Sequence, residues 1–307
     1  MNVVSGCSRH RIGQRGMVLV IVLWIVALLA VMAGTFAYSM RVETRLAAST
    51  VERAQARALA EAGVAYAVAW QLNASAGANR ETRSRWPPNG DSHDWRFGEG
   101  RLRIEVVDAG GLVNLNAAGP DLLGALLKAA GVDPRNQDRL AAAIQDWRDP
   151  DDQPLPGGAE SVAYRAAGRP GPKNAPFESV EELRQVLGMT PELEERLAGA
   201  VTVFARHAGV NPELAPSRVL LALGLDERSV ADYLSARARA AVDGVPPPPL
   251  RPGGGVSFFS QDRTNVYHIA VEAETAAGTA ARVEAVIDLR GRLADKRPRL
   301  LAWREGG

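Results

Sequence analysis

The chain has 307 residues, and its 36 lysine and arginine residues nearly balance its 35 aspartate and glutamate residues, which leaves a formal net charge of +1. This balance gives no overall attraction to nucleic acid or to an acidic membrane surface, so any electrostatic function must be local. The only cysteine, Cys7, precedes a long apolar run, which excludes an internal disulfide, a thiolate metal site and a cysteine nucleophile from the rest of the chain.

Residues 17–40 contain no charged side chain. As a helix they would extend about 36 Å, which exceeds the hydrocarbon core of a bilayer, about 30 Å thick. Arg9, Arg11 and Arg15 precede this run with no acidic residue among them. The positive-inside rule then keeps the N-terminus in the cytoplasm. We expect one membrane span with most of the chain outside the cytoplasm.

Three kinds of export segment compete for this region: a secretory signal peptide, a plain signal anchor, and a prepilin-type leader followed by its helix. A cleavable signal has an apolar stretch of only about 7–15 residues before its cleavage site, and the run here is longer. A prepilin leader is instead cut before the apolar run, at a glycine that follows basic residues, and Arg15, Gly16 and Met17 have that form. Residues 41–72 contain no proline and one glycine, so the helix is expected to continue out of the membrane.

Residues 73–94 are polar, with Gly77, Pro87, Pro88 and Gly90 as breakers, and are expected to form a loop. In residues 101–107 apolar and charged side chains alternate, which predicts a half-buried strand. A long helix followed by a strand is the order found in pilins.

Residues 112–240 have helical character and contain a weak repeat: LLKAAGVDPRNQDRLAAAI, LRQVLGMTPELEERLAGAV and LLALGLDERSVADYLSARA. In each copy a glycine, Gly131, Gly188 or Gly224, is expected to end the first helix in a left-handed conformation. Nine residues later comes Leu140, Leu197 or Tyr233. These units predict helical hairpins.

Helix-hairpin-helix motifs often bind nucleic-acid backbones, which makes a membrane-anchored extracytoplasmic DNA-binding protein the alternative function. Such binding relies on a second glycine two residues after the first. Here those positions hold Asp133, Thr190 and Asp226, and two of them carry a charge that repels phosphate. We therefore favour packing units of a helical region over nucleic-acid binding.

Residues 243–255 combine a proline run with a glycine run and are expected to be a linker. Beyond it, residues 266–274 and 280–289 alternate around a turn, and residues 300–303 could add a last strand. The expected fold class is α+β: a pilin-like long N-terminal helix plus an antiparallel sheet, with a large all-helical, helix-hairpin-helix-like insertion. The divisions are a leader (1–16), a transmembrane part (17–40), a periplasmic continuation (41–72), the first part of a pilin-like domain (73–111), the insertion (112–242), the linker (243–255) and C-terminal strands (256–307).

The densest acidic cluster comprises Asp146, Asp149, Asp151 and Asp152, with Glu160 shortly after. Four aspartates at the end of a helix repel one another and the negative end of its dipole, which a bound cation would relieve. Oxygen ligands alone suit a hard ion, and Ca²⁺ tolerates irregular cages better than Mg²⁺. Pro154 occupies the position where an EF-hand requires glycine, so this is not an EF-hand. A solvated acidic loop without metal is the alternative.

No nucleophile elbow, zinc-protease motif or glycine-rich phosphate loop occurs, and His207 and His268 are isolated in the sequence. We expect no enzymatic activity.

Several segments occur together in one order: the leader ending in Arg15 and Gly16, the long helix, GGLVNLNAA, DWRDPDD with PGGAE, and NAPFESVEELRQVLG. In this combination the chain resembles minor pseudopilin K of type II secretion, the general secretion pathway protein K family. The resemblance implies cleavage between Gly16 and Met17 by prepilin peptidase, N-methylation of Met17, and a place at the tip of a periplasmic pseudopilus that takes part in protein export. It implies minor pseudopilins I and J, and H beneath them, as partners, together with the inner-membrane assembly platform.

The resemblance also implies structural Ca²⁺ in the insertion, and the matching positions are Asp146, Asp149, Asp151, Asp152 and Glu160. Pilins usually carry a glutamate at the fifth residue of the mature chain, where this sequence has Ile21. The K family characteristically lacks that glutamate. A tip subunit has no neighbour above it whose amine needs neutralising, and an unpaired carboxylate at bilayer depth costs about 2.5–3.5 kcal/mol.

Overall fold

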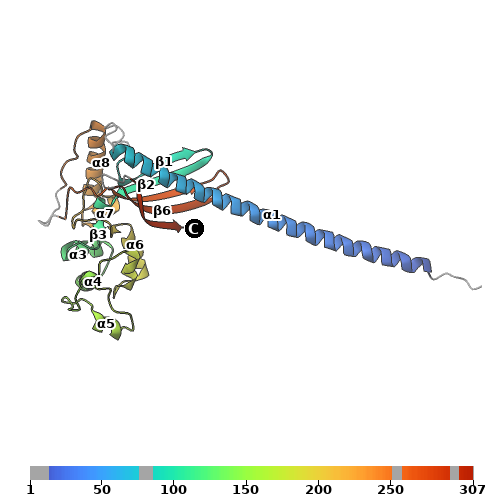
Figure 1. The fold of residues 1–307 in the computed structure, drawn as a ribbon, viewed down its shortest axis with the longest axis horizontal. Coiled ribbons are helices and arrows are strands. Elements are labelled where there is room, and N and C mark those ends of the chain that lie inside the picture. The colour runs from blue at the N-terminus through green and yellow to red at the C-terminus, as the bar shows by residue number, and fades with distance from the viewer. Residues whose placement is uncertain (1–13, 76–85, 251–257, 291–296, 307) are drawn as a thin grey trace, which may run out of the picture. The chain divides into compact units, whose positions relative to one another are not determined.

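The computed structural model describes residues 14–75, 86–250, 258–290 and 297–306 (Figure 1). Most of the predicted leader and residues 251–255 of the predicted linker lie outside these ranges. The chain divides into two compact units, Met1–Gln55 and Ala56–Gly307, which are described separately below.

Helix α1, Gln14–Ser75, begins in the first unit and ends in the second. By length and composition it could cross a membrane, and its most apolar stretch is entirely unburied. Within that stretch the Thr35 hydroxyl donates to the carbonyl of Met32, one turn earlier, at 2.9 Å. A polar side chain satisfied within its own helix is compatible with lipid surroundings. Gly16 and Met17, the predicted processing site, lie in the first turn of the described helix.

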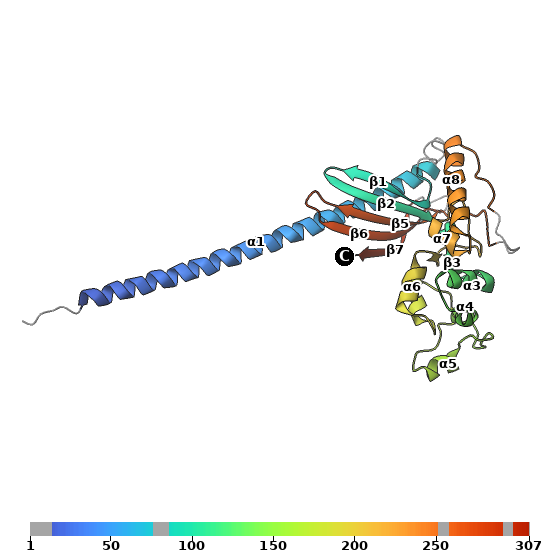
Figure 2. The same cartoon turned by 180° about the vertical axis from the view of Figure 1, so that it is seen from behind.

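The second unit contains one antiparallel sheet in the order β1-β2-β5-β6-β7 (Figure 2). Its strands are β1 Asn89–Phe97, β2 Gly100–Asp108, β5 Val266–Glu274, β6 Ala280–Asp288 and β7 Arg299–Gly306. The end of α1 packs on the sheet through small side chains, Ala60, Val64 and Ala67. At Gly63 a Cβ would stand 2.7 Å from Cγ1 of Val271, so this position admits only glycine at the observed spacing. A long N-terminal helix on an antiparallel sheet confirms the expected α+β class.

Strand β1 corrects the prediction of a loop over residues 73–94, which is wrong from Asn89 onward. The segment has few residues with high strand propensity, and its strand conformation depends on tertiary contacts. The ring of Trp95 stacks on Tyr66 of α1 at 4.1 Å, and His93 stacks on Trp86 at 4.5 Å. These contacts cannot be recognised from local alternation.

Between β2 and β5 the chain forms a mostly helical insertion. Its helices are α3 Pro120–Ala129, α4 Pro134–Arg148, α5 Ser161–Ala166, the 3₁₀ helix η2 Val180–Gln185, α6 Pro191–Ala198, α7 Ser217–Ala222 and α8 Glu227–Asp243. The insertion is not wholly helical, because a 3₁₀ turn η1, Ala109–Gly111, leads into β3, Val113–Asn114, which pairs in parallel with β4, Val201–Thr202. Strands of two residues are too short to produce a recognisable period.

The three predicted hairpins are present. Gly131, Gly188 and Gly224 have φ angles of +79°, +94° and +86°, in the left-handed region that glycine adopts without strain. Leu140, Leu197 and Tyr233, nine residues after these glycines, are buried.

Asp108 closes the insertion at its base. This buried carboxylate accepts hydrogen bonds from the Gly110 N–H at 2.8 Å, the Thr264 N–H at 3.0 Å, the Thr264 hydroxyl at 2.6 Å and the Asn265 N–H at 3.1 Å. It therefore joins the residue that enters the insertion to those that leave it. Nearby, Gly111 lets the backbone at Leu214 pack closely against it, because a Cβ on Gly111 would lie 2.3 Å from the carbonyl oxygen of Leu214.

Replacing Asp108 with alanine should destabilise the second unit strongly. The change leaves buried N–H groups without acceptors, at about 1–3 kcal/mol each, and we expect a total loss of about 3–5 kcal/mol. The measurement is urea unfolding of the full chain. Asp138→Ala, on the exposed face of α4, is the matched control and should shift the free energy of unfolding by less than about 0.5 kcal/mol. Equal effects of the two substitutions would show that the base is held by other contacts.

The contact between His268 of β5 and Thr202 of β4 should weaken in acid. Its Nε2 lies 3.0 Å from Oγ1 of Thr202 in β4, and burial, followed by the charge of Arg218, lowers the pKa of His268 to about 4. Because the unfolded imidazole protonates below about pH 6.5, stability should fall as the pH drops from 6.5 towards 4, by at most about 3 kcal/mol. Above pH 6.5 this group should contribute no pH dependence. The difference in melting temperature between pH 7 and pH 5 should be smaller in His268→Gln than in the unsubstituted protein, and an unchanged difference would contradict the assignment.

Candidate metal centre

The acidic cluster begins at the end of α4, which is held in place by its own side chains. The guanidinium of Arg148 donates to the carbonyls of Leu115 and Ala118. Trp147 is buried and its ring stacks against Phe177, with centroids 6.1 Å apart. These contacts set the direction in which the chain leaves the helix at Asp149.

Segments far apart in the sequence meet around this helix end. Asn116 of GGLVNLNAA donates to the Phe177 carbonyl at 2.9 Å and accepts from the Phe177 N–H at 2.7 Å. Asn174 donates to the Asp151 carbonyl at 2.6 Å. The hydroxyl of Tyr164 accepts from the Leu187 N–H at 2.9 Å. The three segments that carry the family resemblance inside the insertion therefore form one bonded assembly.

Three of the five predicted ligands come together. Asp146, Asp149 and Glu160 each offer a carboxylate oxygen, and these oxygens lie within 4.8 Å of one another. Asp146 is 0% exposed and Glu160 is 3% exposed. Within the described parts of the chain, no lysine, arginine or histidine forms an ion pair with any of the three. No ion pair among the described residues therefore balances these carboxylates, and only the charge of Arg148, which opposes the rise that burial causes in the pKa of Asp149, partly offsets them.

Several of these oxygens have no hydrogen-bond donor. Both carboxylate oxygens of Glu160 and Oδ1 of Asp149 are buried and unpartnered among the described residues. Asp146, by contrast, accepts from the N–H groups of Leu155 at 3.2 Å and Ala159 at 2.7 Å. Buried polar atoms are nearly always satisfied, so unpartnered oxygens that converge on one point fit a cation.

The raised pKa values of these carboxyl groups also favour a bound cation. Burial, reinforced by the charges of Asp146, Asp149 and Asp152, raises the pKa of Glu160 to about 7. Burial also raises the pKa of Asp146 and Asp149, and each is raised further by neighbouring acids. A carboxylate that resists ionisation in the metal-free fold would be stabilised as an anion by a divalent ion beside it.

Gly158 makes the enclosure possible. A Cβ on this residue would stand 2.0 Å from Oδ2 of Asp146, which leaves no room for any side chain. The loop can therefore close against the end of α4 and bury the cluster. Sequence reasoning did not single out this glycine, although it lies in the quoted PGGAE segment.

Asp151 and Asp152 are not among the three carboxylates whose oxygens converge, although, in addition to burial, Asp151 raises the pKa of Asp149 and Asp152 raises that of Glu160. Asp151 accepts from the Gln153 N–H at 2.9 Å, and Asp152 accepts from the Ser161 N–H at 3.2 Å. The hydrogen bonds from Ser161 lower the pKa of Asp152. In this arrangement both residues brace the loop, and direct coordination by them stays a prediction.

The donor set fits a hard cation. Carboxylate oxygens without nitrogen or sulfur favour Ca²⁺, which takes six to eight oxygen ligands and accepts irregular geometry. Asp146, Asp149 and Glu160 would hold the ion, with water and carbonyl oxygens completing its shell. The chemistry that the ion supplies is charge neutralisation, which would join the end of α4 to the start of α5.

The hairpin turns do not present an anion site. The side chains of Asp133, Thr190 and Asp226 cap the helices that follow, accepting from the N–H groups of Arg135, Leu193 and Ser229 respectively. Each occupies the position at which a nucleic-acid-binding hairpin has its second glycine. A backbone N–H in each turn is thus already satisfied, and carboxylates stand where a phosphate would bind in two of the three.

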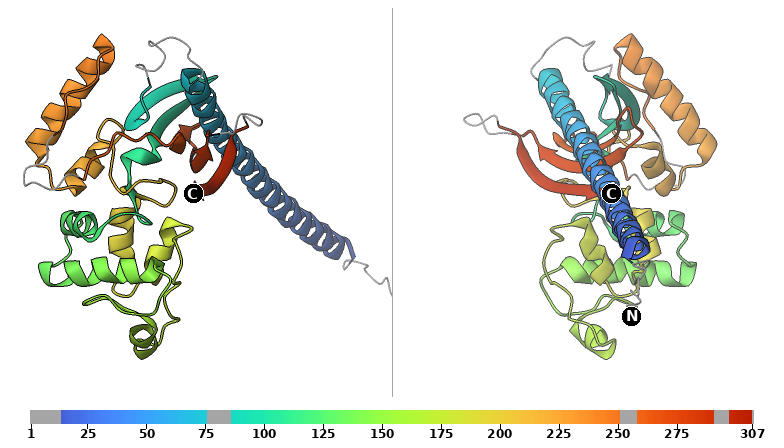
Figure 3. Two further views of the ribbon diagram at one scale, coloured as in Figure 1. Left: turned by 60° about the vertical axis from the view of Figure 1, so that its left-hand side comes forward. Right: turned by 90° about the vertical axis from the view of Figure 1, so that its right-hand side faces the viewer.

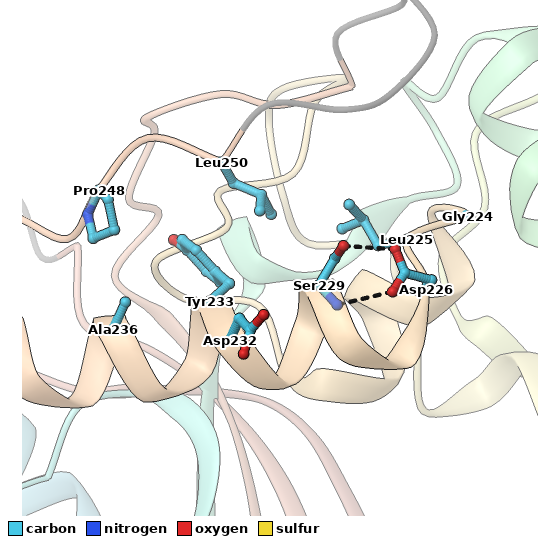
Figure 4. A pocket seen from close by; sticks show the side chains of 9 residues that line it. All are labelled: Gly224, Leu225, Asp226, Ser229, Asp232, Tyr233, Ala236, Pro248 and Leu250. Atoms are coloured by element: carbon cyan, nitrogen blue, oxygen red, sulfur yellow. Dashed lines mark hydrogen bonds between the residues drawn. The ribbon is translucent and has the colours of Figure 1, made fainter.

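A pocket of about 600 Å³ adjoins the third hairpin (Figure 4). Asp226, at the edge of the pocket, accepts hydrogen bonds from the N–H and the hydroxyl of Ser229 at 2.9 and 2.6 Å. Asp232 is the other acid, and Tyr233 and Leu250 supply apolar surface. The lining contains no converging set of polar groups, so it offers no second centre.

Comparisons with known proteins identify the family of the chain. A family model described as type II secretion system (T2SS), protein K, matches residues 105–206, which include the acidic cluster. The type II secretion system protein K of Klebsiella pneumoniae is 31% identical over 236 residues, covering 70% of this chain and 71% of that protein. The putative type II secretion system protein K of Escherichia coli K12 is 30% identical over 208 residues, covering 62% and 63%.

Among solved structures, a chain of the GspK-GspI-GspJ complex from the enterotoxigenic Escherichia coli type 2 secretion system is similar. Its TM-score is 0.51 at 16% identity, and the match covers 83% of this chain and 99% of that one. This likeness shows the fold: a long N-terminal helix on an antiparallel sheet, with a helical region.

Calcium should raise the melting temperature of the full chain in lipid nanodiscs. A ligand at 1,000 times its Kd stabilises a fold by about 4 kcal/mol, and chelation should reverse the shift. Glu160→Gln should remove most of the response, and in chelator it should melt no lower than the unsubstituted protein, because it relieves repulsion within the cluster.

Asp138→Asn, on the same helix as Asp146 but outside the cluster, is the control and should keep the full response. A melt that calcium and chelator leave unchanged would exclude a structural ion.

Proposed function

The chain belongs to the type II secretion system protein K family, and we propose that it is the minor pseudopilin at the tip of the pseudopilus, where it initiates assembly and takes part in protein export across the outer membrane. The observation that carries the proposal is the 31% identity to the Klebsiella protein K over 71% of that protein's length. This family is a non-enzymatic part of the secretion apparatus, which confirms that the chain is not an enzyme.

Minor pseudopilins I and J are the partners that we propose. Support comes from the similar solved chain, which belongs to a GspK-GspI-GspJ complex and is matched over 99% of its length. Pseudopilin H beneath them, the assembly platform of the inner membrane, and prepilin peptidase complete the proposed set.

The apolar part of α1 would anchor the chain in the inner membrane, with its N-terminus in the cytoplasm and the second unit in the periplasm. Arg9, Arg11 and Arg15 before the apolar run support this orientation. Prepilin peptidase would cut between Gly16 and Met17 and leave Met17 as the methylated first residue.

The place at the tip is supported by Ile21, the fifth residue of the proposed mature chain. A subunit with a neighbour above it can pair a carboxylate at this depth with that neighbour's amine. A subunit with none would bury the charge unpaired, at about 2.5–3.5 kcal/mol. An apolar residue is what the topmost subunit requires.

Within this role, the proposed Ca²⁺ is structural. Asp146, Asp149 and Glu160 would hold it between the end of α4 and the start of α5. Its effect would be to keep the insertion folded in the periplasm.

Coexpression with prepilin peptidase and with pseudopilins I and J tests the proposal. Mass spectrometry should find a chain that begins at Met17 and carries one added methyl group, and the detergent-solubilised chain should copurify with both partners. The soluble part should show no salt-dependent retention on immobilised DNA. A chain that keeps residues 1–16, or that purifies without I and J, would contradict the proposal.

A further inference from the structure

A second pocket, of about 490 Å³, lies between the first two helical hairpins and the loop of the acidic cluster. Its floor is apolar and is formed by Leu140, Ala143, Leu187 and Leu193. Leu140, Ala143 and Leu193 are buried. One wall is the loop at Gly157 and Gly158. The volume lies within the range of about 300–1,000 Å³ typical of ligand sites.

The walls of this pocket are fixed by hydrogen bonds. The Ala159 N–H is bound by Asp146 at 2.7 Å, and the Leu187 N–H is bound by Tyr164 at 2.9 Å. Thr190 caps α6 through the Leu193 N–H. The pocket is therefore preformed, and a ligand would not bear the cost of ordering it.

The charged side chains that line this pocket are all positive. Arg139 and Arg196 line the pocket, and no aspartate or glutamate does. Both arginines are exposed, and neither forms an ion pair within the described part of the chain. Arg139 Cγ lies 3.2 Å from where a Cβ of Gly157 would stand, and Arg196 Nη1 lies 3.9 Å from the corresponding point on Gly131. The two cations thus border the pocket from different hairpins.

The pocket combines an apolar floor with two guanidinium groups that form no ion pair among the described residues. Hydrogen bonds lower the pKa of Glu192, and the charge of the nearby Arg196 lowers it further. Guanidinium binds carboxylate with paired hydrogen bonds, while the floor would take up an apolar side chain. Nucleic acid fits the pocket poorly. No aromatic ring lines it for base stacking, and an apolar floor makes no favourable contact with a phosphate.

We propose that this pocket binds a short segment of another protein, one that carries a carboxylate beside an apolar side chain. Protein interfaces concentrate much of their binding energy in a few anchored side chains, among which arginine is common. The proposal goes beyond assembly of the pseudopilus. The residues that line the pocket come from α4, α5 and α6 and from the loops beside them, and none of them belongs to a strand of the sheet (Figure 3).

The test uses the full chain in lipid nanodiscs, with calcium present, and a fluorescein-labelled peptide, Gly-Ser-Leu-Asp-Leu-Gly, followed by fluorescence anisotropy. The peptide should bind at least about tenfold more tightly than its Asn counterpart, since a charge-assisted pair is lost in the latter. The double variant Arg139→Gln with Arg196→Gln should abolish that difference.

Arg135→Gln with Arg228→Gln removes the same charge from exposed positions outside the pocket and should preserve the difference. Equal affinity for the two peptides, no binding by the unsubstituted chain, or the same loss in both double variants would overturn the proposal. So would displacement of the peptide by octanoate at comparable concentration, which would assign the pocket to small amphipathic acids. Copurification with I and J should be unaffected by either double variant, which separates failure of this site from failure of the proposed function.

Discussion

The fold depends on one buried carboxylate at the base of the insertion. Asp108 ends β2, and through four hydrogen bonds it holds both the turn that opens the insertion and the residues that begin β5. Together with the pairing of β2 and β5, these bonds offset the entropic cost of closing a loop of more than 150 residues. A second tie is Arg237 of α8, whose buried guanidinium donates to the Ala215 carbonyl at 2.7 Å and lies 3.8 Å from Asp91 of β1.

The insertion, closed at its base by Asp108, contains two sites that the antiparallel sheet lacks: the acidic cluster and the pocket bordered by Arg139 and Arg196. The acidic cluster at the end of α4 concentrates unsatisfied oxygens, and the loop that encloses it also forms a wall of the arginine-bordered pocket. The same loop residue, Ala159, contributes to both: its N–H binds Asp146, and it lines the pocket. A cation that stabilises the cluster would therefore also stabilise the pocket.

Much of this architecture could be predicted from the sequence, where the physical signal was local. An uncharged stretch followed by a stretch without proline predicted α1. The alternation predicted β2, β5 and β6, and three glycines predicted the hairpins. Strand β1 was missed because its side chains are mostly polar and its stability depends on Tyr66 and Trp86, which lie outside it. The pairing of β3 with β4 was missed because it joins residues almost 90 positions apart through two residues each.

The candidate centre shows the same limit. All five acids were recognisable by their density, but which carboxylates converge depends on the path of the loop between Asp149 and Glu160. That path is set by Gly158 pressed against Asp146 and by Asn174 bound to the Asp151 carbonyl, contacts that span up to 23 residues. The left-handed φ of +49° at Asn174 belongs to this arrangement and has no signal in the local sequence.

The central claim is that the chain occupies the tip of a pseudopilus, and a single label tests it most directly. Cys7 is the only cysteine and lies in the proposed leader, so a processed chain with Ser235→Cys, at an exposed position on α8, would carry one thiol. Electron microscopy of pseudopili treated with maleimide-coated gold should then find one particle at one end of each filament. Particles spaced along the filaments would contradict the claim.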